Sequence, residues 1–88
     1  MHAVVFQVDL VPGRDQQAES ELDFLTGMLK STPGFLRGTW AGDDTHGLSF
    51  LLFDTEEAAR NIADNGGMPP DASATFRSVD VYAVARDI

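Results

Sequence analysis

Cysteine is missing from this chain of 88 residues, so neither a disulfide nor a thiolate metal site can stabilise it. A domain of this size buries only about 60–65% of the surface that its unfolded chain exposes, which leaves a thin margin of stability. Association with a partner is the remaining common way for such a chain to bury more surface.

Basic side chains are also scarce, with 6 against 14 acidic ones and a formal net charge of −8. A nucleic-acid or anionic membrane surface selects for a basic footprint, so we expect neither as a partner. No run of about 18 apolar residues is present, which argues against a membrane span. Arginine outnumbers lysine, and with abundant Ala, Asp and Gly this composition suggests a GC-rich bacterial source.

The sequence alternates in its first stretch, "MHAVVFQVDLV", where Gln7 and Asp9 interrupt the apolar residues and no basic segment precedes them. Such alternation predicts a strand over residues 2–11 and not a signal peptide. We therefore expect a cytoplasmic protein.

Helical spacing follows, with Ala18, Leu22, Leu25 and Leu29 on one stripe of a helix predicted over residues 15–31. Two strands are predicted over residues 35–42 and 47–53, joined by the turn sequence "GDDTHG". A second helix begins near a capping box formed by Asp54 and Glu57 and ends at residues 65–67. The last predicted strand, 75–86, places Phe76, Tyr82 and Val84 on one face and Val79, Val81, Ala83 and Ala85 on the other.

This β-α-β-β-α-β order predicts one α+β domain over residues 1–88, with a ferredoxin-like antiparallel sheet of four strands and two helices on one face. Residues 50–53 are apolar on both faces of their strand, although the helices cover only one. An uncovered apolar face of this extent would favour aggregation. We therefore expect a second copy of the chain to cover the open face.

Three segments carry a family resemblance: "VPGR" at 11–14, "TPGFLRGTW" at 32–40 and "FDTEEAAR" at 53–60. With the element order, they make the chain similar to the antibiotic-biosynthesis-monooxygenase-like (ABM-like) domains of the dimeric α+β barrel superfamily. The resemblance implies a homodimer paired sheet to sheet. Members of the superfamily include cofactor-independent oxygenases of polycyclic aromatics, haem-degrading enzymes, isomerases and proteins without known activity.

In the oxygenase branch, a Trp, an Asn and a Tyr near a pocket assist deprotonation of the substrate. The resemblance thus suggests Trp40, Asn61 and Tyr82 as catalytic residues, with Asn65 as the alternative to Asn61. The simpler interpretations are a Trp40 packed in the core or the dimer barrel, an Asn61 on the solvent face, an Asn65 that caps its helix, and a Tyr82 at a sheet edge.

Small residues on the second helix, Ala58, Ala59 and Ala63, either allow close packing against the sheet or leave a cavity. A cavity would suit an aromatic or polyketide-like ligand. The predicted lining residues of this ligand pocket are Phe24, Met28, Phe50, Met68 and Phe76.

Other polar groups have simple interpretations. Asp43, Asp44 and His46 could bind a divalent metal, but a solvated polar turn is the simpler interpretation and the one we favour. Arg37 and Arg77 could meet an anionic ligand or form surface salt bridges. No histidine stands out as an axial haem ligand, so we expect no cofactor and no metal.

Two functions remain. The first is an ABM-like domain that binds a small apolar or aromatic molecule, with cofactor-independent monooxygenase activity as its enzymatic form. The alternative is a non-catalytic homodimeric module with a ligand-sensing or structural role.

Overall fold

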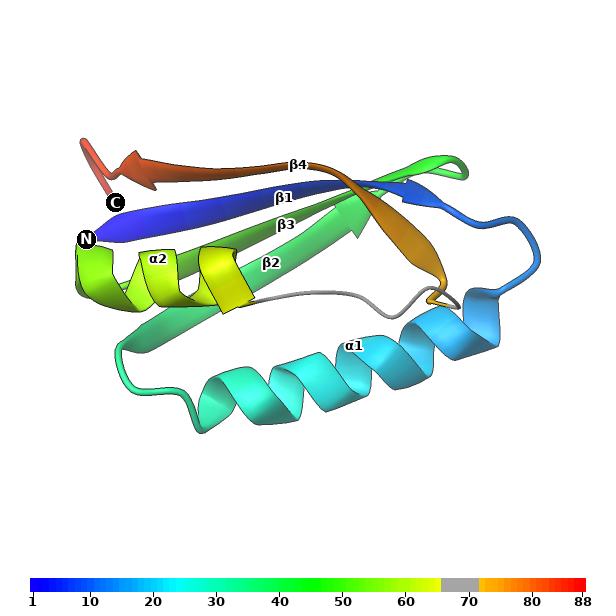
Figure 1. The fold of residues 1–88 in the computed structure, drawn as a ribbon, viewed down its shortest axis with the longest axis horizontal. Coiled ribbons are helices and arrows are strands. Elements are labelled where there is room, and N and C mark those ends of the chain that lie inside the picture. The colour runs from blue at the N-terminus through cyan, green and yellow to red at the C-terminus, as the bar shows by residue number, and fades with distance from the viewer. Residues whose placement is uncertain (66–71) are drawn as a thin grey trace.

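The strands and helices follow the predicted order in a computed structural model that describes residues 1–65 and 72–88. Along the chain they are β1 (His2–Leu10), α1 (Asp15–Lys30), β2 (Phe35–Gly42), β3 (His46–Phe53), α2 (Glu56–Asn65) and β4 (Ala74–Ala83) (Figure 1). No described helix has the length and apolarity needed to cross a membrane.

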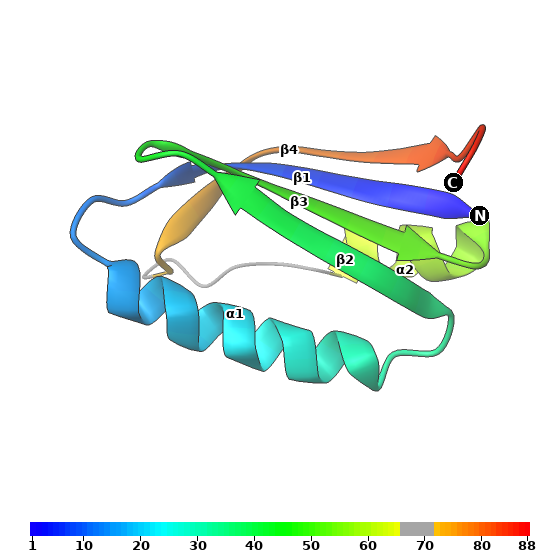
Figure 2. The same cartoon turned by 180° about the vertical axis from the view of Figure 1, so that it is seen from behind.

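The four strands form one antiparallel sheet in the order β2-β3-β1-β4, with β1 and β3 at its centre. Both helices lie on the same side of this sheet, as the front and back views show (Figures 1 and 2). This is the predicted ferredoxin-like α+β fold.

The helix-facing side of the sheet carries the core. Side chains alternate between the two faces of a strand, and the register pairs Val4 with Leu51 on the same face. These two residues form the buried core with Phe6, Leu29, Phe53 and Ala59. Ala59 is fully buried, and its small side chain lets α2 pack closely against β1, β3 and β4.

Helix α1 is held less closely than α2. Of its residues only Leu29, in the last turn, is buried, with 2% of its surface exposed. Ala18 and Leu25, on the predicted apolar stripe, are half-buried, and Leu22 is exposed. The N-terminal half of α1 therefore covers the sheet without filling the space beneath it.

A β-bulge changes which face Phe76 joins. The pairing of β4 with β1 shifts between Gln7 and Val8, so Arg77 is an extra residue in β4. Phe76 therefore pairs with Val8 on the helix-facing side, and its ring stacks on Phe6 with the centroids 5.2 Å apart. The predicted placement of Phe76 on the same face as Tyr82 is wrong, because one inserted residue reverses the alternation that period-two spacing assumes.

The C-terminal segment, residues 84–88, crosses one end of the open face, which is the side of the sheet away from the helices. Val84 donates its N–H to the carbonyl of Met1, and Asp87 forms an ion pair with Arg37. Because β4 and β2 are opposite edges of the sheet, a chain leaving β4 must pass over β1 and β3 to reach Arg37. Ala3 and Leu52 lie beneath this path on the open face, and each is only 2% exposed.

The connection from β3 into α2 differs from the predicted capping box. The hydroxyl of Thr55 accepts a hydrogen bond from the N–H of Ala58 at 3.1 Å, so Thr55 caps the helix. Asp54 instead contacts the turn before β2, where its backbone N–H donates a hydrogen bond to the carbonyl of Gly34 at 2.9 Å. Gly34 has a φ of +86°, and a Cβ there would lie 2.7 Å from the Asp54 carboxylate.

Candidate functional site

A cleft of about 370 Å³ lies between the N-terminal half of α1 and the sheet. A smaller cavity of about 70 Å³ continues it toward α2, where Ile62 contributes to the wall. Apolar side chains from both sides dominate the lining, chiefly Val8, Leu10, Leu22, Leu25 and Trp40. Trp40 lines both spaces and therefore stands where they meet.

The position of Trp40 depends on a neighbouring glycine. Trp40 pairs with Ser49, on the helix-facing side of β2, and packs partly buried against the core. A Cβ at Gly38 would lie 3.1 Å from Cη2 of Trp40 and 2.9 Å from Cδ2 of Leu51. The indole ring therefore lies back over Gly38, where any larger residue would displace it.

Two further glycines open the floor of the cleft. Gly42 and Gly47 pair directly across β2 and β3, and both line the cleft. A Cβ at Gly47 would lie 2.9 Å from Cγ2 of Val8, and one at Gly42 would lie 2.6 Å from the carbonyl oxygen of His46. Because neither position carries a side chain, the surface of the sheet leaves space for the cleft here.

Glu21 brings a carboxylate into this apolar setting. It extends from α1 to the residue before β4, where it accepts hydrogen bonds from the backbone N–H of Ser73 at 3.1 Å and from the Ser73 hydroxyl. Both residues line the cleft. Glu21 was not among the predicted site residues, although it lies three residues after Ala18 and four before Leu25, which is the spacing of the inward face.

The three predicted catalytic residues do not meet within one chain. Trp40 faces the helices, whereas Tyr82 pairs with Ala3 on the opposite face of the sheet and is 56% exposed. Asn61 is exposed on α2, where its side-chain and backbone oxygens accept hydrogen bonds from the amide of Asn65 at 2.7 and 2.9 Å. Of the three, only Trp40 lines the cleft beneath α1.

The predicted pocket residues are also divided. Met28 lines the smaller cavity, and Phe76 lies on the helix-facing side against Phe6. Phe24 is 72% exposed on α1, and Phe50 lies on the open face opposite Val5. Met68 lies outside the described residues.

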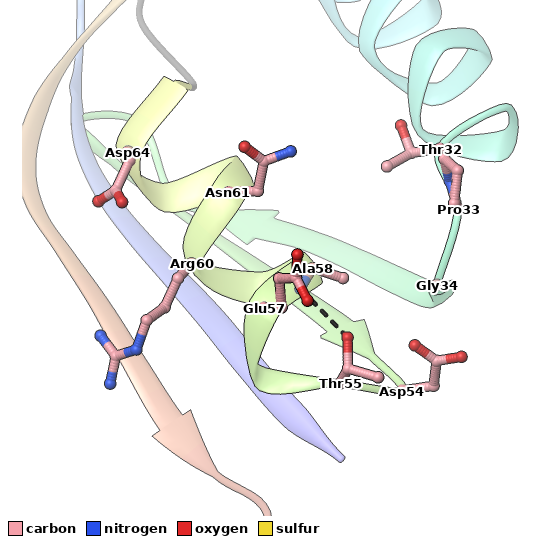
Figure 3. Close-up of a pocket in the computed structure, with 10 residues that line it drawn as sticks. All are labelled: Thr32, Pro33, Gly34, Asp54, Thr55, Glu57, Ala58, Arg60, Asn61 and Asp64. Atoms are coloured by element: carbon pink, nitrogen blue, oxygen red, sulfur yellow. Dashed lines mark hydrogen bonds between the residues drawn. The ribbon is translucent and has the colours of Figure 1, made fainter.

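A second, wider groove of about 770 Å³ runs between the turn that precedes β2 and the exposed side of α2 (Figure 3). Seven of its ten described lining residues are polar, including the exposed side chains of Asp54, Glu57, Arg60, Asn61 and Asp64. Apolar burial is what usually holds a small molecule in a pocket, so the cleft beneath α1 is the better candidate site.

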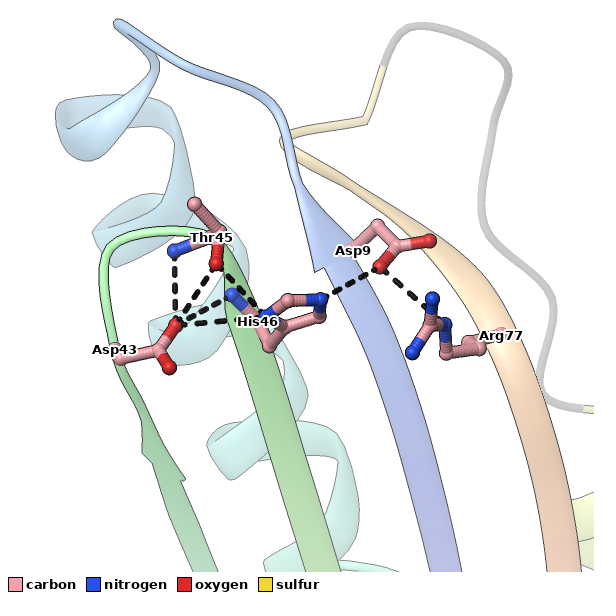
Figure 4. A network of polar contacts seen from close by, with 5 residues as sticks. All are labelled: Asp9, Asp43, Thr45, His46 and Arg77. Atoms are coloured by element: carbon pink, nitrogen blue, oxygen red, sulfur yellow. Dashed lines mark hydrogen bonds and ion pairs between the residues drawn. The ribbon is translucent and has the colours of Figure 1, made fainter.

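Polar side chains form a network at one end of the open face (Figure 4). Nε2 of His46 lies 3.5 Å from Asp9, which in turn lies 3.5 Å from Nε of Arg77. Oδ1 of Asp43 accepts from the N–H groups of Thr45 and His46 at 2.9 and 2.7 Å. The Thr45 N–H, and then that of His46, hold the pKa of the Asp43 carboxyl below its ordinary value.

This arrangement has the geometry of an ordered polar turn, the simpler of the two interpretations offered by the sequence. Within residues 1–65 and 72–88, no three histidine or acidic side chains come together in a way that could hold a metal ion. The predicted surface salt bridges of Arg37 and Arg77 are present, with Asp87 and Asp9.

Comparison with known proteins gives structural likeness only. No protein-family model matches the chain, and no curated protein matches it significantly. Among solved structures, it is similar to the haem-degrading protein MhuD from Mycobacterium tuberculosis with two haems bound in its active site, at 15% identity and a TM-score of 0.74, over 100% of this chain and 99% of that one. It is also similar to SnoaB, a cofactor-independent oxygenase from Streptomyces nogalater, at 17% identity and a TM-score of 0.73, over 99% and 96% of the two chains. The chain therefore has the ABM-like fold that its sequence resembles.

Proposed function

We propose that this chain binds a small, largely apolar aromatic molecule in the cleft beneath α1. The observation that carries the proposal is the cleft itself, which has an apolar lining, a glycine floor and Trp40 in its wall. A flat ring could stack on the indole while aliphatic side chains cover its edges. The fold is compatible with this role, because one similar structure contains haem and another is an oxygenase.

Haem does not fit the described lining well. The two histidines of the chain, His2 and His46, are absent from the walls of the cleft and of the smaller cavity, so neither supplies an axial imidazole there. The described lining carries the carboxylates of Glu21 and Asp43 and no arginine or lysine to receive the haem propionates. A ligand that needs no metal is favoured, and cofactor-independent oxygenation is the enzymatic form of this function.

Binding without catalysis is the second candidate. Tyr82 is on the far face of the sheet and Asn61 is outside the cleft, so one chain does not supply the three-residue set that the resemblance implies. Oxygen consumption in the presence of a bound aromatic ligand separates the two: uptake supports a monooxygenase, and its absence with tight binding supports a ligand sensor.

Binding is tested by calorimetric titration of the protein with a panel of bicyclic and tricyclic aromatics. Trp40→Leu should weaken binding roughly two- to tenfold through the loss of aromatic stacking worth roughly 0.5–1.5 kcal/mol, and further because part of the wall is lost. Tyr82→Phe, on the other face of the sheet, is the control and should bind like the wild type. Failure of the whole panel to bind would overturn the proposal.

The proposal includes a homodimer in which a second copy of the chain covers the open face. Val5, Leu48, Phe50 and Tyr82 lie on this face beyond the C-terminal segment. Leu48 is 41% and Phe50 36% exposed, and charged pairs border them at both ends, Arg37–Asp87 and Asp9–Arg77. An apolar centre with a polar rim is the usual anatomy of a protein interface.

A further inference from the structure

Glu21 has unused capacity to accept hydrogen bonds. An ionised carboxylate offers about four acceptor positions on its two oxygens. Oε1 receives both the N–H and the hydroxyl of Ser73. Among residues 1–65 and 72–88, Oε2 has only long contacts, at 3.4 Å to the Ser73 N–H and 3.5 Å to Nε2 of Gln17. Both exceed the usual length of a hydrogen bond, so Oε2 can accept a shorter one from a ligand.

Ser73 fixes the orientation of this carboxylate. It provides two donors to one oxygen, from a residue that is itself buried. Such a pair holds the Glu21 side chain across the end of the cleft instead of letting it turn to solvent. Glu21 is thereby held in the lining of the same cleft as Leu22, Leu25 and Trp40.

The second acidic side chain of the lining has a different task. Oδ1 of Asp43 accepts hydrogen bonds from two backbone N–H groups and from the Thr45 hydroxyl, so it stabilises the turn between β2 and β3. The described lining contains no positive side chain to offset Glu21. A ligand carboxylate placed there would meet like charge in a partly desolvated space, whereas an O–H or N–H donor would gain a charge-assisted hydrogen bond.

We propose that Glu21 sets the ligand class of the cleft: an aromatic body that carries a hydroxyl or ammonium donor, with carboxylated aromatics excluded. This inference rests on the proposed function, because it requires that aromatic molecules bind beneath α1. It assigns to Glu21 a role in specificity, with Ser73 as the residue that positions it.

The test uses three ligands with the same ring system: 1-naphthylmethylamine as its cation, 1-naphthol, and 1-naphthoate. Calorimetric titration at high salt screens the long-range effect of the net charge, so that local contacts decide the order. The wild type should bind the ammonium most tightly, the naphthol next and the naphthoate least, with roughly a tenfold or greater span from first to last.

Glu21→Gln should collapse this order, because the amide keeps an acceptor oxygen for Ser73 but loses the charge. Glu19→Gln, exposed on the same helix, removes the same charge from the surface and should leave the order unchanged. The wild-type order is a test even if the Glu21 variant folds poorly. Equal binding of the three ligands, or tightest binding of naphthoate, would overturn this inference and leave the proposed function intact. No binding of any aromatic would instead overturn the proposed function.

Discussion

Arg37, on the edge strand β2, forms an ion pair with Asp87, which follows the opposite edge strand β4. This contact joins residues at the two borders of the sheet and holds the C-terminal segment across its open face. Leu52 and Ala3, on the open face between these two edges, are each only 2% exposed in the single chain. Only the remaining part of the open face is therefore available to a second copy.

Removal of residues 85–88 should destabilise the protein by about 1–2 kcal/mol, since Leu52 then meets water. Asp87→Ala should cost about 1 kcal/mol or less, the usual range for an exposed ion pair. Thermal unfolding followed by circular dichroism measures both. Deletion of Ile88 alone, which is fully exposed, is the control. Equal stability of the long deletion and this control would show that the segment does not protect Leu52.

Leu29 is the one buried side chain of α1. Leu29→Ala should lower the free energy of unfolding by about 2–5 kcal/mol, because it empties a site in the core. Phe24→Ala removes a larger side chain from the same helix, but that ring is mostly exposed, so we expect a change within about 0.5 kcal/mol. Chemical denaturation of the two variants provides the comparison. A larger loss for Phe24 would mean that its ring is buried in solution, for example by a partner.

Much of the fold follows from local patterns in the sequence. Alternation in residues 2–10 and helical spacing between Ala18 and Leu29 were enough to predict the element order, because each pattern has one period and clear Pro or Gly boundaries. The sheet order then follows from the few topologies that such an order allows. The bulge at Arg77 could not be predicted this way, because a strand with a bulge contains the same kinds of residues as a regular strand.

The site was harder to predict because it depends on distances between elements. Trp40 was identified from its residue type and from the family resemblance. Glu21 was not predicted as a site residue, although its position relative to Ala18 and Leu25 marks the inner face of α1. Its partner Ser73 is 52 residues away along the chain, and no local pattern links the two.

Two glycines should respond oppositely to alanine. Gly34 has a positive φ, and a Cβ there would contact Asp54, so Gly34→Ala should destabilise by roughly 1–2 kcal/mol or more. Gly27 lies inside α1 with open space around it, so Gly27→Ala should stabilise by roughly 0.5–1 kcal/mol. Urea unfolding of both variants tests the pair. A stable Gly34→Ala protein would contradict the left-handed turn.

Asp43 should make the hairpin turn sensitive to acid. Its pKa is lower in the folded protein than in the unfolded chain, so the carboxylate stabilises the fold above the ordinary Asp value of about 3.9. This contribution disappears as the pH falls through the lowered value. The difference in unfolding free energy between wild type and Asp43→Ala should therefore be largest near neutral pH and shrink in acid. Asp44→Ala, in the same turn, is the control. A stability difference between wild type and Asp43→Ala that grows in acid would contradict the lowered pKa of Asp43.

Phe50 gives the sharpest test of the homodimer. Phe50→Asp places a charge at the centre of the open face, where a monomer would leave it in water but a dimer would bury it. We expect the wild type to sediment with twice the mass of one chain and Phe50→Asp to sediment as a monomer. Phe24→Asp introduces the same charge on exposed α1 and should remain dimeric. A monomeric wild type would overturn the homodimer, and a dimeric Phe50→Asp would move the interface to another surface.

The same variant separates assembly from ligand binding. Phe50 and the cleft lie on opposite faces of the sheet, so a monomeric Phe50→Asp should still bind aromatic ligands if the cleft is complete within one chain. Loss of binding together with the dimer would mean that the second copy contributes to the site. In that case Tyr82, on the open face, is the residue to examine next, since pairing of the sheets would bury it.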